Sequence, residues 1–373
     1  MTTDKKVGIY VHIPFCIKKC NYCDFCSFPE RNFPSKKEYI DALISEIESY
    51  SGKNIILDSI FFGGGTPSIL EPFEFSEIVR SIRRVFLLDD DLEFTVEANP
   101  KTLNAEKLSA YRALGVNRVS MGMQSIHEKE LKKLGRIHNY DDFLESFKLV
   151  KASGIENINV DVMYGIPEQT KESFEKTLKT LLDLRPSHIS VYGLILEEGT
   201  PFFNNKDSLV LPSDDEECDM YYLASDLLKS HGYNHYEISN YALDGAECRH
   251  NMKYWRCDDY IGVGLSAYSL YKGRRFGNTD NYARYVGEKD LLQYNETLDT
   301  ASMAYEYVML HLRMAEGFSL NEYKELFGTD FSAGREEIIQ KLVNLKLLEQ
   351  NGDILSLTEK GFYVSNAILT ELI

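Results

Sequence analysis

The chain has 373 residues and a formal net charge of −17, with 43% hydrophobic and 27% charged residues. This length fits one large α/β domain with an appendage, or two to three domains of a globular protein. The acidic charge argues against sequence-independent nucleic-acid binding, which relies on Lys and Arg, so we expect no nucleic-acid partner. The sequence has no apolar run near the roughly 18 residues of a membrane span and no secretory leader pattern, so we expect a cytoplasmic protein.

The first half of the chain alternates strand-like apolar runs with amphipathic helical patterns. Strands are predicted at residues 8–15, 58–65, 93–100, 118–125, 157–165 and 188–196, and helices between them at 35–50, 72–86, 104–115, 140–154 and 171–184. Six βα units in succession predict a parallel sheet, either curled into a barrel or left open.

Beyond about residue 200 this alternation ends. A helix is predicted at 211–233 and a strand at 234–243, whereas 245–290 is rich in Gly, Tyr and Arg and predicts loops. Three helices at 303–314, 319–328 and 335–350, followed by a strand pair at 351–361, resemble a winged helix. The segment 301–373 holds six Lys or Arg against eleven Asp or Glu. Such a charge suits packing or protein contact better than DNA reading.

These patterns predict three regions. The expected fold class is α/β, with the six βα units, as a barrel or an open sheet, over residues 1–205 and an α+β connecting region over 206–298. A winged-helix-like module is expected over 299–373.

The stretch "CIKKCNYCDFC", residues 16–26, contains four of the seven cysteines. Cys16, Cys20 and Cys23 have the spacing C-x3-C-x2-C in the loop after the first predicted strand, on the face where parallel barrels carry their active sites. Three thiolates on one loop can each hold one iron of a cubane cluster and leave the fourth iron open to a ligand. Because Cys26 forms a second C-x2-C with Cys23, a zinc site held by all four remains the alternative. A reducing cytosol argues against disulfides.

Polar residues and glycines lie at or near the C-terminal ends of the next four predicted strands. Taken singly, each also fits a glycine turn, a strand end or a buried amide bonded to backbone. Together, at successive strand ends beside the cysteine loop, they are expected to surround one cleft. They are Gly63, Gly64, Gly65, Thr66, Glu97, Asn99, Gln124 and Asp161.

The segment "YVHIPFCIKKCNYC" resembles the radical S-adenosylmethionine (SAM) signature of oxygen-independent coproporphyrinogen III oxidases and their relatives. "FFGGGTPS", "EANP", "SMGMQS" and "DVMYGIPEQT" are similar to the later motifs of that family, in the same order, and the resemblance covers residues 7–195. It implies a partial (β/α)6 TIM-like barrel with a [4Fe-4S] cluster that binds SAM at its open iron. An electron passed through the cluster would then cleave the sulfonium bond to give a 5′-deoxyadenosyl radical.

The resemblance also implies roles for individual residues. His12, before the cysteine loop, would either donate to cluster or substrate or be a hydrogen-bonded strand histidine. The implied iron ligands are Cys16, Cys20 and Cys23; Tyr10 would line the site; Gly64, Gly65 and Thr66 would hold the methionine end of SAM; and Glu97, Gln124, Arg136 and Asp161 would contact the rest of it.

Two departures from the oxidase pattern bear on function. Phe25 stands where the oxidases have a fourth cysteine, and only nine residues precede Tyr10, where the oxidases have a long extension. Downstream, "HNMKYW" (250–255) matches the motif of the heme chaperones of this superfamily, called HemW. A neutral His250 could ligate heme iron, with Tyr254 and Trp255 as flat apolar surfaces, or it could be a buried loop histidine. Cys248 and Cys257 flank the motif, in no assigned role.

The resemblance therefore implies a heme chaperone, which carries heme as cargo to acceptor hemoproteins such as membrane-bound respiratory enzymes. A cytosolic electron donor would reduce its cluster, and a homodimer is left open. The alternative is the oxidase itself, an enzyme that decarboxylates coproporphyrinogen III. A zinc-bound regulator with a winged helix is a third, more distant reading.

Overall fold

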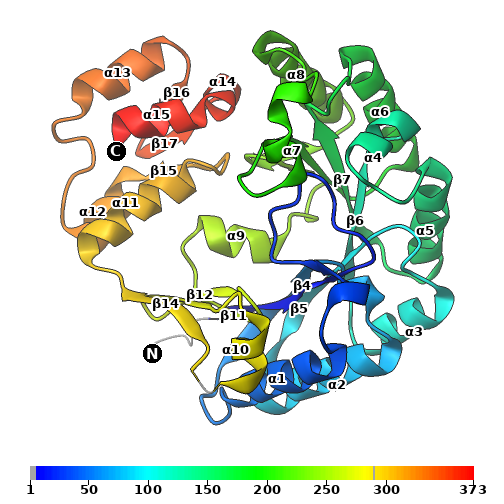
Figure 1. Cartoon of the computed structure of the whole chain (residues 1–373). Coiled ribbons are helices and arrows are strands. Elements are labelled where there is room, and N and C mark those ends of the chain that lie inside the picture. Colours follow the sequence, from blue (N-terminus) through cyan, green and yellow to red (C-terminus); the bar gives the residue numbers. More distant parts are fainter. Residues whose placement is uncertain (1–5, 289) are drawn as a thin grey trace.

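The computed structural model describes residues 6–288 and 290–373. Six parallel strands lie side by side in chain order, and their connecting helices cover the outer face (Figure 1). This arrangement confirms the predicted partial (β/α)6 barrel. The strands are β1 (Val7–Ile13), β4 (Ile56–Gly64), β5 (Leu87–Ala98), β6 (Arg118–Gln124), β7 (Asn157–Tyr164) and β8 (His188–Gly193), and the helices are α1 (Lys36–Glu48), α2 (Pro72–Val85), α3 (Ala105–Ala113), α4 (Glu128–Lys133), α5 (Tyr140–Ala152) and α6 (Lys171–Leu184).

Local sequence explains where these elements begin and which faces they bury. Ser35, Asn104, Asn139 and Thr170 each cap a helix by accepting a hydrogen bond from a backbone N–H in its first turn. All seven residues of β6 are buried. Because strand side chains alternate in direction, its polar and small residues face the barrel interior while its Val and Met residues face the helices.

Residues beyond the barrel extend the same sheet at both edges, so that 12 of the described strands belong to one sheet. Beside β1 lies the parallel β11 (Tyr260–Val263), followed by β12 (Tyr268–Tyr271), β13 (Arg274–Asn278) and β14 (Leu292–Thr297). At the other edge, β10 (Asn240–Ala242) and β9 (Asn234–Glu237) follow β8.

Two of our expectations for this region are wrong. The segment 245–290, predicted as loops, contains α9 (Arg249–Trp255), three of the added strands and α10 (Tyr282–Gly287). The segment 234–243 is a hairpin and not one strand. These elements are only three to seven residues long, too short to show a clear hydrophobic period.

The C-terminal module has its own hydrophobic core, and its small antiparallel sheet has the order β15-β17-β16. Tyr221 of α8 (Asp214–Ser230) belongs to that core, so the module packs on α8. The helices and the small sheet agree with the expected winged-helix-like module. Its elements are α11 (Thr300–His311), β15 (Phe318–Ser319), α12 (Leu320–Phe327), α13 (Glu336–Asn344), β16 (Leu348–Asn351), β17 (Ile354–Leu357), α14 (Glu359–Tyr363) and α15 (Ser365–Leu372).

The three-region division at residues 205 and 298 stays a prediction, since one sheet continues across residue 205. The remaining short elements are β2 (Phe15–Cys16), β3 (Phe28–Pro29) and α7 (Pro201–Asn204). None of the helices in the described part of the chain is both long and apolar enough to span a membrane.

A buried carboxyl group joins the barrel to its sheet extension. Glu46 of α1 accepts hydrogen bonds from the backbone N of Gly264 (2.9 Å), Asn278 Nδ2 (2.7 Å) and the Tyr285 hydroxyl (2.6 Å). Burial nevertheless raises the pKa of the Glu46 carboxyl to about 7. The neutral form is therefore favoured in the folded state at mildly acidic pH.

The raised pKa of Glu46 predicts a pH-dependent stability. Its contribution is fully present below the unfolded pKa of 4.5 and is lost as the pH rises through about 7, a change of roughly 3 kcal/mol in the free energy of unfolding. Glu46→Gln should flatten that part of the profile between pH 5 and 7.5, measured by denaturant unfolding. If the free energy of unfolding changes equally with pH in both proteins, Glu46 is not the group responsible.

Candidate functional site

The cysteine loop lies over the C-terminal ends of the barrel strands. Cys16 is buried at the end of β2, which pairs with β3, and Cys20 and Cys23 are half-buried in the connecting loop. All three line one cavity of about 140 Å³. Cys26 is not among the described residues that line it; its carbonyl oxygen accepts a hydrogen bond from His12 Nε2 at 2.8 Å. This placement favours three cysteine ligands over four.

Every other residue expected to touch SAM, except Tyr10, lines the same cavity. They are Gly64, Gly65, Thr66, Glu97, Gln124, Arg136 and Asp161. Five successive strand ends or the loops after them thus contribute to one site, as the pattern of strand ends predicted. No three His, Cys, Asp or Glu side chains in the described ranges lie close enough to share a single metal ion.

The glycine turn after β4 passes directly beside the cysteine loop. A Cβ on Gly64, at φ +106°, would come within 2.4 Å of the His12 ring, and one on Gly65 within 2.6 Å of a backbone oxygen. The backbone of this turn therefore lies so close to His12 and the cysteine loop that a side chain at either glycine would clash. Thr66 Oγ1 donates to Cys16 Sγ at 3.6 Å and accepts from Asn99 Nδ2 at 2.8 Å, which ties the turn to the loop.

Arg136 crosses the end of β6 into the cavity. Its Nη1 donates to Asn99 Oδ1 at 2.7 Å, and its Nη2 donates to the side-chain oxygen of Gln124. A Cβ on Gly122 would lie 2.4 Å from Nη2, so this strand position must remain glycine for the guanidinium to fit. The arginine Nε is buried without a partner among the described residues. The guanidinium thus keeps donor capacity for a ligand carboxylate.

Two buried carboxyl groups, Glu97 and Asp161, face the same cavity. Burial, and then the nearby Asp161, raise the pKa of Glu97 to about 8, and burial raises the pKa of Asp161. Glu97 accepts from the backbone N of Gly64 at 3.1 Å, and Asp161 accepts from Asn159 Nδ2 at 2.7 Å. A cationic ligand, or one that brings hydroxyl donors, would stabilise both as carboxylates. These two acidic groups therefore fit a ligand with a sulfonium cation and the hydroxyl groups of a ribose.

Tyr10 and His12 lie on β1 beneath the loop. The Tyr10 hydroxyl is 3.1 Å from His12 Nδ1, while His12 Nε2 donates to the Cys26 carbonyl. Burial lowers the pKa of His12 to about 4, so its ring is neutral. Here His12 is a hydrogen-bonded strand histidine that supports the cysteine loop. Tyr10 lines a second pocket next to the first.

This second pocket, of about 300 Å³, brings the HNMKYW motif to the expected SAM residues. His250, Asn251 and Tyr254 line it together with Tyr10, Gly64, Glu97 and Asp161. Trp255 is not among its described lining residues, and the Arg313 guanidinium lies 5.9 Å from its ring. Cys257 lines a separate cleft beside the C-terminal module. Residues about 240 positions apart in the sequence therefore share one pocket wall.

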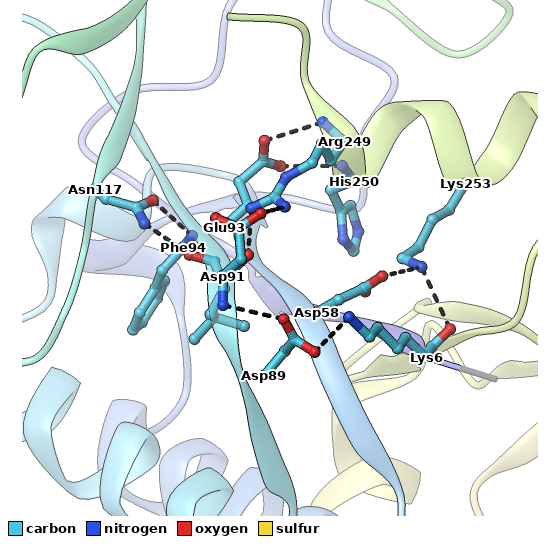
Figure 2. A network of polar contacts seen from close by, with 11 residues as sticks. Lys6, Asp58, Asp89, Asp91, Glu93, Phe94, Asn117, Arg249, His250 and Lys253 are labelled. Atoms are coloured by element: carbon cyan, nitrogen blue, oxygen red, sulfur yellow. Dashed lines mark hydrogen bonds and ion pairs between the residues drawn. The ribbon is translucent and has the colours of Figure 1, made fainter. Parts of the chain in front are cut away.

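The motif forms α9, whose N-terminus is anchored by a carboxylate of the barrel. Glu93 of β5 accepts from the backbone N–H groups of Arg249 (2.9 Å) and His250 (3.0 Å), as Figure 2 shows. Arg249 also pairs with Asp91, and Lys253 with Asp58, at 2.7 and 2.8 Å (Figure 2). These contacts fix α9 against β4 and β5.

His250 is completely buried, and both ring nitrogens have partners. Nδ1 lies 2.9 Å from Ser59 Oγ, and Nε2 lies 2.9 Å from the Tyr254 hydroxyl. Its ring stacks on Phe61 with centroids 5.2 Å apart. Burial lowers the pKa of His250 to about 3, which keeps the ring neutral. The prediction of a loop position is wrong, whereas the heme-ligand role stays a prediction.

Four further residues that were not predicted from the sequence also line the second pocket: Arg118, Ser120, Asn159 and Ser190. A signal was present in β6, where Arg118, Ser120, Gly122 and Gln124 alternate with apolar residues and so share one face.

A partial parallel barrel with a three-cysteine loop over the C-terminal ends of its strands defines the class of radical SAM proteins. The comparisons agree: the Radical SAM superfamily matches residues 10–181, and the HemN C-terminal domain matches residues 298–364. The coproporphyrinogen III oxidase (HemN) structure from Escherichia coli superimposes with a TM-score of 0.86 over 99% of this chain and 90% of that one. At 23% identity this likeness shows the fold alone.

Curated relatives narrow the assignment. Proteins named heme chaperone HemW from Lactococcus lactis and Bacillus subtilis are 35% and 36% identical to this chain, over 99% and 96% of it and 98% and 97% of their own lengths. The protein of the same name from Escherichia coli is 32% identical, over 97% of both chains. The chain belongs to the HemW family.

The cavity lining predicts which cysteines hold the cluster. Reconstituted wild-type protein should contain about four irons and absorb broadly near 400 nm. Cys20→Ala should lose this absorption, because it removes one of the three thiols that face the cavity, and Cys26→Ala should keep it. Loss of the cluster in the Cys26 variant would overturn the ligand assignment.

The buried acids predict a loss of SAM affinity on substitution. Glu97→Ala and Asp161→Ala should each weaken SAM binding about 10- to 100-fold, the usual effect of losing a hydrogen bond to a charged group. Anaerobic calorimetry measures this, with Glu106→Ala on the exposed surface of α3 as the control. Unchanged affinity in both site variants would mean that the acids are structural.

Proposed function

We propose that this chain is a heme chaperone, which binds heme and passes it to acceptor hemoproteins while retaining a cluster and a SAM site. One observation carries the proposal: the HNMKYW helix α9 is anchored by Glu93 so that His250 and Tyr254 share a pocket with Glu97 and Asp161. The names of relatives that match nearly the full chain support it.

His250 is the proposed heme ligand. Its neutral imidazole is the form that coordinates iron, and its low pKa keeps it so across the physiological range. Because Nε2 now contacts the Tyr254 hydroxyl, ligation requires the tyrosine to give up that contact to the iron. Tyr254 lines the second pocket, so its displacement would let the heme iron reach the His250 imidazole from that pocket.

The cluster and SAM form the second part of the proposal. Cys16, Cys20 and Cys23 would hold the [4Fe-4S] cluster, and the glycine turn with Arg136 would orient the methionine end of SAM. When bound, the reduced cluster would supply the electron that cleaves a carbon–sulfur bond of the SAM sulfonium. A cytosolic electron donor would reduce the cluster, and the acceptors include membrane-bound respiratory enzymes.

A second candidate is the oxygen-independent coproporphyrinogen III oxidase, because the cysteine loop and the later motifs also resemble those of that enzyme family. Phe25, at the position of the fourth oxidase cysteine, and the HNMKYW motif favour the chaperone. We therefore keep the oxidase as the alternative.

His250→Ala tests the heme ligand. Loss of a direct iron bond should shift the heme Soret band and weaken binding, while the iron–sulfur signal stays unchanged because the cysteines lie on another loop. His231→Ala, which removes an exposed histidine, is the control. The thiol of Cys248, two residues before His250, could replace the lost ligand, so the spectral shift is a stricter criterion than affinity. An identical Soret band in the His250 variant would rule out this ligand.

A turnover assay separates the chaperone from the enzyme. Wild-type protein with SAM and a strong reductant should form no protoporphyrinogen from coproporphyrinogen III. Steady product formation would establish the oxidase, whatever the result at His250.

A further inference from the structure

Arg118 is a charged residue in the barrel interior that the proposed function leaves unexplained. It is the first residue of β6, its exposed fraction is 2%, and it lines the second pocket. Its guanidinium makes no hydrogen bond or ion pair with any described residue, and its Nε is fully buried. By contrast, Arg136 in the neighbouring cavity has two side-chain partners.

The carboxylates nearest to Arg118 are already engaged elsewhere. Glu93 accepts from two backbone N–H groups at the start of α9, and Asp161 accepts from Asn159 Nδ2. Both influence Arg118 electrostatically, but no ion pair joins either of them to it among the described residues. Burying a guanidinium without a partner is costly, and such a group is normally paired with an anion. The five donors of Arg118 are thus left for something that enters the pocket.

The pocket extends from the cysteine cavity to Arg118, and its lining includes the carboxyl groups of Glu97 and Asp161 as well as this arginine. Phe25, with 60% of its surface exposed, borders it and also borders the cysteine cavity, whereas Arg118 is buried. Aromatic rings of Tyr10, Phe61 and Tyr254 form part of the wall. A volume of about 300 Å³ is at the lower end for ligand pockets. It suits one edge of a porphyrin with its side arm, and the displacement of Tyr254 that ligation by His250 requires would enlarge it.

We propose that Arg118 binds a propionate of the cargo porphyrin. The carboxylate enters beside Tyr254 and pairs with the guanidinium through two parallel hydrogen bonds, the geometry in which arginine binds carboxylates best. Arg118 is then a positioning residue that holds the porphyrin next to α9. This inference rests on the proposed heme cargo and adds the group by which the cargo is recognised.

Heme and heme dimethyl ester, in which both propionates are blocked, test the inference without any mutation. Wild-type protein should bind heme about 10- to 100-fold more tightly than the ester, as expected for a charged hydrogen-bonded pair, in titrations followed at the Soret band. Equal affinities would overturn the role of the propionate and leave the heme chaperone intact. Failure to bind either compound would overturn the proposed function itself.

The variant Arg118→Gln tests whether this arginine causes the preference for heme over its ester. It should bind heme and the ester with the same affinity, close to that of wild type for the ester. Arg83→Gln, which removes the same charge from the exposed surface of α2, should keep the wild-type ratio. If the Arg118 variant retains that ratio, the inference is wrong.

A carboxylate is also present in SAM, so SAM binding is measured on the same variants. Arg118→Gln should bind SAM as wild type does. If the variant loses SAM affinity but still prefers heme over its ester, Arg118 binds the carboxylate of SAM and not a propionate. That result would overturn our assignment. Should Arg118→Gln fail to fold, the comparison of the two porphyrins on wild-type protein still decides whether a propionate is recognised.

Discussion

The buried carboxylate of Glu93 is the interaction on which the arrangement of the site depends. It lies on the central strand β5 and accepts the first backbone N–H groups of α9, which would otherwise be buried without partners. Removing it would leave two orphan donors and release the motif helix from the barrel wall. Everything that the second pocket brings together, from Tyr10 on β1 to Tyr254 on α9, requires this helix to stay in place.

Much of the barrel could be predicted from the sequence. Its strands are long, apolar and separated by capped amphipathic helices, so local pattern and tertiary packing agree. The cysteine loop and the strand-end residues followed from the same reasoning, because parallel strands present their C-terminal ends on one face. The connection between α9 and β5 could not be predicted, since Glu93 and His250 are 157 positions apart and nothing local distinguishes this carboxylate from a surface one.

The other differences between the sequence-based predictions and the structure concern buried side chains. His250 is predicted in a loop because the surrounding sequence has no hydrophobic period, yet it lies on a short helix and its own side chain is completely buried. Arg118 read as an ordinary strand residue, and only the side-chain environment shows that its charge has no partner among the described residues. Both are cases in which a tertiary environment, and not the residue's neighbours in the chain, sets the chemistry.

The position of β1 in the sheet has a consequence for biosynthesis. β1 pairs with β4 on one side and with β11, about 250 residues later, on the other. While the chain is being made, the edge of β1 that will receive β11 stays open until residue 263 has left the ribosome. Such a long-range parallel pairing is slow to form, and open strand edges invite association between nascent chains. The rate of synthesis and the access of folding chaperones to the nascent chain should therefore influence the yield of folded protein more than the stability of its finished core.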